Sequence, residues 1–229
     1  MHRIVSVLVL MMGLTIGCSS SGSTKVLTPT QLKPALLTTA DVGNKYRETS
    51  TSTTDASSST DNTDSLQSIG GSPSCQSLFK QLSGTEKGIN KATRKFRRSD
   101  GVALESQASS ARDSSKTIGQ FRQVISTCKS FSVDQNGTKL NARLQQADVP
   151  SLGDDSVGIK MHVSGDVKSG SASVHVSVDV FGIVIRRGAS LAHVTITGTI
   201  NRRGNTVPVK MSEITPLAPK ADAKLAKVA

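Results

Sequence analysis

The residues best suited to covalent chemistry in this sequence are its three cysteines, Cys18, Cys75 and Cys128. A cysteine thiol can bind a metal, pair with a second thiol or carry a lipid. Metal binding is disfavoured because each cysteine stands alone, without the nearby His or second Cys that zinc sites require. We therefore expect no metal at these residues.

Cys18 ends a segment with the layout of an export signal. A short basic start precedes an apolar run from Ile4 to Ile16, which is too short to span a membrane comfortably, and serines follow the cysteine. Leu14 to Cys18 resembles the lipobox of bacterial lipoproteins, with Thr15 where leucine is usual. The alternative is an ordinary secretory signal in which the cysteine is incidental.

The lipobox resemblance implies a processing step and a location. Residues 1–17 would be removed as a signal peptide, and the Cys18 sulfur would receive a diacylglycerol with acyl chains such as palmitate. Residues 18–34 would form a flexible tether. We therefore expect a lipid-anchored protein on the outer face of the bacterial cytoplasmic membrane.

The two remaining cysteines, Cys75 and Cys128, are expected to form a disulfide because an exported chain folds in an oxidising compartment. In the chain-entropy model, closing a loop of this size stabilises the fold by about 4 kcal/mol. The alternative is a pair of buried free thiols.

The charge balance of the chain is strongly basic, with 28 Lys and Arg against 17 Asp and Glu and a formal net charge of +11. In an exported protein this balance favours anionic lipid head groups or anionic wall polymers as partners. Nucleic acid is disfavoured because groups that stack on bases are scarce: the sequence has no Trp, one Tyr and five Phe.

Five cations close in sequence form a candidate surface for anions: Lys91, Arg94, Lys95, Arg97 and Arg98. On a strand, Lys95 and Arg97 would face one side and Arg94 the other, so the charges would not form a single stripe. The alternative is a solvated basic surface that binds no ligand.

No pattern for catalysis or for a cofactor is present. The sequence lacks the G-x-S-x-G nucleophile elbow and the H-E-x-x-H zinc helix, and its S-x-x-K matches lack their companion motifs. Asp154 and Asp155 could hold a cation, although adjacent carboxylates after a glycine are more typical of a turn. We expect neither enzyme activity, nor a cofactor, nor a metal.

Three histidines, His162, His175 and His193, each fall opposite the apolar residues of a predicted strand and are expected to be exposed. A turn centred near Lys168 would place His162 across from His175. Exposed histidines on strands need no ligand, so we assign them no role.

A helix over Asp113–Phe131 is expected to organise the fold. Apolar residues recur along it at steps of three and four, which is the period of a helix with one buried face: Ile118, Phe121, Val124, Ile125 and Cys128. A second helix is expected from Pro73, carrying Cys75, and a short basic helix over Pro219–Val228.

Alternation of apolar and polar residues predicts an antiparallel sheet with one wet face. The segments are Tyr46–Thr53, Ala92–Arg98, Val102–Ala108, Phe131–Asp134, Thr138–Leu144, Val157–Val163, Val174–Val180 and Ala192–Ile196. The apolar phase changes at Gly182, which predicts a β-bulge there. Residues 50–71 are rich in Ser, Thr and Asp, and a mobile loop is expected over them.

The order of these landmarks resembles the extracellular sensor domain of the mycobacterial receptor kinase PknH and its stand-alone actinobacterial lipoprotein relatives. The matching stretches are Ala35–Leu37 with Ala40–Val42, Cys75, Phe121–Phe131, Gly153–Val157 and Ile183–Gly188. The resemblance implies one α+β domain over residues 35–229, with an antiparallel sheet packed against two or three helices. The chain departs from the resemblance in having one available disulfide and no tryptophan.

Together these features predict a membrane-anchored lipoprotein with a sensor-like, non-catalytic domain that binds a small ligand or a partner at the cell envelope. Two alternatives are a carrier for lipid or glycolipid and an attachment protein for anionic wall polymer. A lipid carrier would need a large continuous apolar cavity, whereas a wall-attachment protein would bind with strong salt dependence.

Overall fold

The structure is a computed structural model, and it describes residues 25–56, 69–84, 89–112, 114–135, 138–169, 172–200 and 205–229. The expectations for the signal segment and for Cys18 lie outside these residues. Within the described residues, no helix is both long and apolar enough to cross a membrane.

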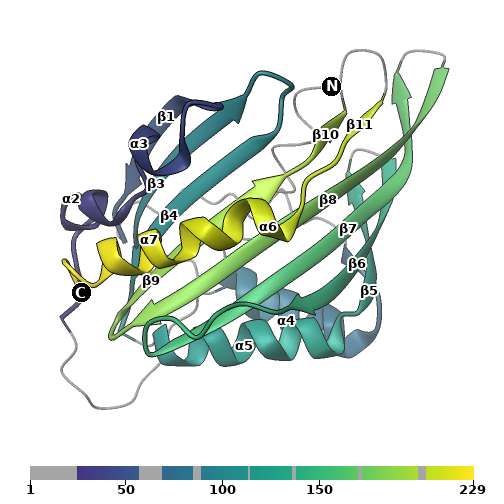
Figure 1. The fold of residues 1–229 in the computed structure, drawn as a ribbon. Helices are drawn as coiled ribbons and strands as arrows, with labels where there is room; N and C mark the ends of the chain where they lie inside the picture. The colour runs from purple at the N-terminus through teal and green to yellow at the C-terminus, as the bar shows by residue number, and fades with distance from the viewer. Residues whose placement is uncertain are drawn as a thin grey trace.

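One antiparallel sheet of nine strands dominates the molecule, in the order β1-β3-β4-β9-β8-β7-β6-β5-β2 (Figure 1). Its strands are β1 (Tyr46–Thr54), β2 (Ile69–Gly70), β3 (Asn90–Arg98), β4 (Ala103–Ser110), β5 (Ser130–Gln135), β6 (Thr138–Ala147), β7 (Asp155–Ser169), β8 (Ala172–Arg187) and β9 (Ser190–Thr197). A small second sheet pairs β10 (Thr199–Ile200) with β11 (Thr206–Val207). The predicted strand segments are therefore present, and most are longer than expected.

Helices cover the two faces of the large sheet over different strands (Figure 1). On one face, α4 (Pro73–Gly84) and α5 (Ser114–Thr127) pack over β5 to β8. On the other face, α2 (Pro29–Leu32), α6 (Met211–Ile214) and α7 (Ala218–Leu225) pack over β3, β4, β9 and the end of β8. The remaining helical segments are α3 (Thr39–Val42) and the 3₁₀ turns Lys33–Ala35 and Thr215–Leu217.

The side-chain period of β8 shows how one sheet serves two cores. Val180 and Val184 belong to the core under α5, whereas Phe181, Ile183 and Ile185 belong to the core under α7. Successive side chains of a strand point to opposite faces, so these two cores lie on opposite sides of the sheet.

Helix α5 confirms the predicted organising element but is shorter than expected, because it ends at Thr127 and β5 begins at Ser130. All five residues of its apolar stripe are buried, and Cys128 directly after the helix forms a disulfide with Cys75 of α4. The disulfide joins segments 53 residues apart in sequence and fixes α4 beside α5. The predicted α+β class, with an antiparallel sheet, packed helices and a single disulfide, is confirmed.

Two expected flexible segments are more ordered than the sequence suggests. Leu27 and Leu32 are buried, and the Leu27 amide donates to Ser110 Oγ at 3.0 Å, so the domain begins before the expected boundary at residue 35. In the expected loop over residues 50–71, β1 continues to Thr54 and β2 occupies Ile69–Gly70, while residues 57–68 lie outside the described part.

The predicted bulge at Gly182 is wrong. Gly182 lies opposite Ile159 on β7 and Thr195 on β9, and the register is continuous on both sides. The apolar phase changes because both faces of this part of β8 are buried, each under its own helices. One face is wet only over the first half of the strand, where His175 is exposed.

Candidate functional site

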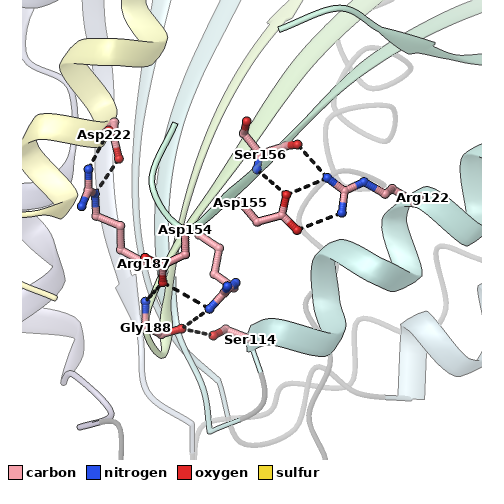
Figure 2. A network of polar contacts seen from close by, with 9 residues as sticks. Ser114, Arg122, Asp154, Asp155, Ser156, Arg187, Gly188 and Asp222 are labelled. Carbon is pink, nitrogen blue, oxygen red and sulfur yellow. Dashed lines mark hydrogen bonds and ion pairs between the residues drawn. The ribbon is translucent and has the colours of Figure 1, made fainter. Parts of the chain in front are cut away.

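A network of polar contacts joins α5, the start of β7, the β8–β9 turn and α7 (Figure 2). Asp154 Oδ2 accepts a hydrogen bond from the Gly188 amide at 2.7 Å and from Arg186 Nη1 at 3.2 Å. Ser114, the first residue of α5, donates through its hydroxyl to the Gly188 carbonyl at 2.6 Å. The turn is therefore held from both sides.

The second part of the network fixes α5 to β7. Arg122 forms a bidentate ion pair with Asp155, at 2.6 and 2.8 Å, and also donates to the Ser156 carbonyl. The hydrogen bonds from Arg122 lower the pKa of Asp155, while partial burial opposes them. A separate bidentate pair, Arg187 with Asp222, fixes α7 to the end of β8.

These contacts decide between the two interpretations of Asp154 and Asp155. Each carboxylate is engaged by an arginine, which leaves the pair suited to a structural turn and not to holding a cation. Among the described residues, no group of three or more His, Cys, Asp and Glu side chains gathers in a way that could hold a metal ion.

A different set of polar residues, all buried except the partly buried Glu105, lies on the sheet face that α5 covers. We call it the polar strip: Glu105, Gln107 and Ser109 of β4 with His193, Thr195 and Thr197 of β9. Glu105 lies opposite Thr195, and Gln107 lies opposite His193. The strip continues the face of Val180 and Val184 onto the neighbouring strands, where apolar side chains give way to polar ones.

The polar strip is buried but incompletely hydrogen-bonded. Gln107, Ser109 and Thr197 are 6%, 1% and 1% exposed. Within the described part of the chain, Gln107 Nε2, Ser109 Oγ and Thr197 Oγ1 have no hydrogen-bond partner. Buried polar atoms are almost always paired in folded proteins, and an unpaired one costs about 1–3 kcal/mol. Three such atoms on one face of two adjacent strands require partners from outside the described residues, such as buried water or a polar ligand.

Glu105 brings an ionisable group to one end of the polar strip. Burial raises the pKa of Glu105 above its usual range, and the nearby ammonium groups of Lys95 and Lys91 partly oppose that shift. Lys95 Nζ lies 3.5 Å from Glu105 Oε2. Lys95 is half exposed, with 50% of its side chain accessible. The pair therefore reaches from the buried strip toward the solvent.

His193 lies inside the polar strip, which corrects the expectation that it is exposed. It is 3% exposed, and its ring centroid is 5.9 Å from that of Phe121 on α5. The reason is the same as for β8: the strand is buried on both faces, so a polar residue in the alternating pattern does not face water. Phe121 gives the strip an apolar side wall.

The other two histidines do not lie opposite each other. His162 lies across from Asp179 and His175 across from Asp166, each with a nitrogen to oxygen distance of 2.9 Å. The pairing of β7 with β8 continues to Ser169 opposite Ala172, further along the chain than expected, so the register differs from the expected one and each histidine has a carboxylate neighbour.

The five candidate anion-binding cations divide between the two faces of β3, as alternation predicts. Arg94 lies on the α7 face and donates to the Leu37 carbonyl and to Thr51. Arg98, on the same face, forms ion pairs with Asp100 and Glu213 at 2.9 and 2.6 Å. Lys91, Lys95 and Arg97 lie on the opposite face. The structure therefore brings only three of the five cations to one side.

The polar strip is not predicted by the sequence alone. Its residues occupy every second position of β4 and β9, and that alternation was interpreted as a solvated face. The residue types of β9 carry a signal for burial. Its polar positions on this face are histidine and threonine, and no Lys, Glu or Asp occurs between Ser190 and Thr197. The exposed positions of β6, by contrast, include the charged residues Lys139 and Arg143.

Comparison with known proteins supports the fold. No family model and no curated protein sequence matches the chain. Among solved structures, it is similar to the crystal structure of the extracellular domain of PknH from Mycobacterium tuberculosis, with a TM-score of 0.53, 11% identity, and coverage of 89% of this chain and 98% of that chain. An uncharacterized protein from Mycobacterium smegmatis gives a TM-score of 0.49 at 13% identity, over 87% of this chain and 94% of that one. The similarity to the PknH domain confirms the expected resemblance at the level of the fold.

Proposed function

We propose that this chain is an extracytoplasmic binding protein, anchored through a lipid on Cys18 to the outer face of the bacterial cytoplasmic membrane. Its domain acts by recognition and not by catalysis, in the manner of a sensor domain. The ligand is a small polar molecule or the polar group of a partner, and it binds at the polar strip. The disulfide supports the location, because such bonds persist in oxidising compartments.

The observation that carries this proposal is the set of buried polar atoms without a partner on β4 and β9. A ligand that accepts a hydrogen bond from the Gln107 amide and exchanges hydrogen bonds with the Ser109 and Thr197 hydroxyls would remove their desolvation cost. Such a site selects for polar groups, because an apolar ligand would leave the same atoms unpaired. This preference for polar groups distinguishes the proposed site from the apolar cavity of a lipid carrier.

The first test is native mass spectrometry of the Cys18→Ser chain, exported by its own bacterial host, compared with the same sample after denaturation. We expect an additional mass that is lost on denaturation and that identifies the class of ligand. A bare native mass would remove the support for a tightly bound ligand and leave only weak recognition, which calorimetric titration with the secreted metabolites of the host would detect.

Two variants locate the site. Gln107→Leu removes the side-chain amide whose Nε2 has no hydrogen-bond partner among the described residues, so it should abolish the additional mass while the protein stays folded. Gln145→Leu on β6 is the matched control, because Gln145 is exposed and lies far along the sheet order from β4. Equal ligand occupancy in Gln107→Leu and in the unaltered protein would place the ligand elsewhere.

A further inference from the structure

The two edges of the nine-stranded sheet are built differently. One edge is β2, which has only two residues. The other edge is β1 (Figure 1). It has nine residues and is exposed from Arg47 to Thr54. In the described part of the chain, β1 pairs only with β3, so the backbone groups on its outer side have no strand partner.

The second half of β1 lacks the features that usually protect an edge strand. Natural edges are kept from pairing by lysines, prolines, bulges or short length. Ser50–Thr54 contains only serine and threonine, and its pairing with β3 is regular over all five residues. The single irregularity of β1 lies before this segment, between Glu48 and Ser50. An uncharged, regular and exposed edge of this kind is a template for another strand.

We infer that this edge pairs with the same edge of a second copy of the chain. In an antiparallel pair with its two-fold axis at Ser52, Ser50 of each copy lies opposite Thr54 of the other, and Thr51 lies opposite Thr53. Every pair then joins two hydroxyl side chains, a favourable combination across antiparallel strands. The segment is therefore complementary to itself.

Charge does not oppose this pairing at physiological ionic strength. On β1 itself Arg47 lies outside the paired segment Ser50–Thr54, and the next row of cations is Lys91, Lys95 and Arg97 on β3, one strand inward from the edge. Two β3 strands in the pair would be three strand spacings apart, about 14 Å. This exceeds the Debye length of about 8 Å at physiological ionic strength but is less than the length of about 30 Å at 0.01 M. Association through this edge should therefore strengthen as salt is added, unlike a complex held by opposite charges.

Cysteine cross-linking tests the geometry directly. In the Cys18→Ser chain with its native disulfide, Ser52→Cys supplies a single free thiol at the proposed two-fold axis. We expect rapid formation of a disulfide-linked dimer under mild oxidation, with the domain still folded. Asn141→Cys is the matched control, since Asn141 is equally exposed but lies on β6 within the sheet.

Sedimentation velocity over a wide range of protein concentrations measures the free energy of dimerisation. The Cys18→Ser chain should show a monomer–dimer equilibrium whose dimer fraction rises between 0.01 M and 0.15 M salt. Ser52→Lys places two ammonium groups opposite each other and should weaken dimerisation about tenfold or more, whereas Asn141→Lys should not.

The proposal fails if the chain sediments as a monomer at every concentration and if Ser52→Cys cross-links no faster than Asn141→Cys. Capture of a different protein by Ser52→Cys, without dimers of the chain, would also overturn it, because the edge would then serve an extended segment of another partner.

Discussion

At the scale of single residues, Glu105 is the group whose ionisation should affect stability most clearly. Its pKa is raised in the folded state by burial, so the folded protein holds the proton more tightly than the unfolded chain does. The contribution of Glu105 to stability should therefore be most favourable below the ordinary pKa of glutamate, decrease as pH rises from that value through the raised one, and then level off.

The Glu105→Gln variant tests this prediction. A neutral side chain of the same size removes the titration, so the decrease in stability over that pH window should be absent from the variant. Urea unfolding of both proteins between pH 4 and pH 8 provides the measurement. Parallel pH profiles would show that Glu105 titrates normally and that the Lys95 pair compensates its burial.

A second residue-scale prediction concerns Arg122, whose ion pair with Asp155 joins α5 to β7. Arg122→Met keeps an unbranched aliphatic stem but removes the guanidinium and its hydrogen bonds to Asp155 and Ser156. Because the pair is partly exposed, we expect a loss of about 1 kcal/mol of unfolding free energy at neutral pH. The loss should disappear as pH falls through the lowered pKa of Asp155, where that carboxylate is protonated in both proteins. Asn141→Met, at an exposed position, is the control.

At the scale of elements, the disulfide between α4 and α5 should contribute strongly to stability. The Cys75→Ala and Cys128→Ala double variant opens a link between positions 53 residues apart, for which the chain-entropy model gives about 4 kcal/mol. Thermal unfolding should reveal the decrease. Reduction of the unaltered protein should reproduce it, and unchanged unfolding in both cases would show that packing alone holds the two helices.

The elements also show what the sequence could predict. Helix α5 was predictable because one buried face leaves a clear apolar stripe, and the β5–β6 hairpin because Asn136 and Gly137 favour a tight turn. The end of β8 and all of β9 are buried on both faces, so alternation no longer indicates which side faces water. That loss of information explains the errors at Gly182 and His193.

The candidate site was less predictable than the fold. Gln107 and Thr197 lie on strands separated widely in sequence, and only the β4–β9 pairing brings their strands together. A single sequence does not specify such long-range pairing, because many strand orders satisfy the same alternation. The basic residues around Arg94 are close in sequence, which suggests one common surface. The alternation of side chains along β3 instead places them on opposite faces of the sheet.

At the scale of the whole molecule, the proposed lipid anchor predicts where the protein is found. Cys18→Ser should release the chain from membranes into the soluble fraction, because a secreted domain without acyl chains has no comparable membrane affinity. Detergent phase partitioning of cells expressing each form provides the measurement. Identical partitioning of the two forms would contradict the lipobox, and Cys75→Ala serves as the control for the loss of a cysteine.

The early start of the folded domain would limit how far the molecule stands from a membrane if Cys18 carries the proposed anchor. Leu27 is already buried in the domain, and the seven residue steps from Cys18 to Lys25 span at most roughly 25 Å. A tether running to residue 34 would have allowed more than twice that height. The end of the domain that carries α2 must then stay close to the lipid head groups. The protein would sample a thin layer of the envelope next to the bilayer, and ligands or copies of the chain would meet it there.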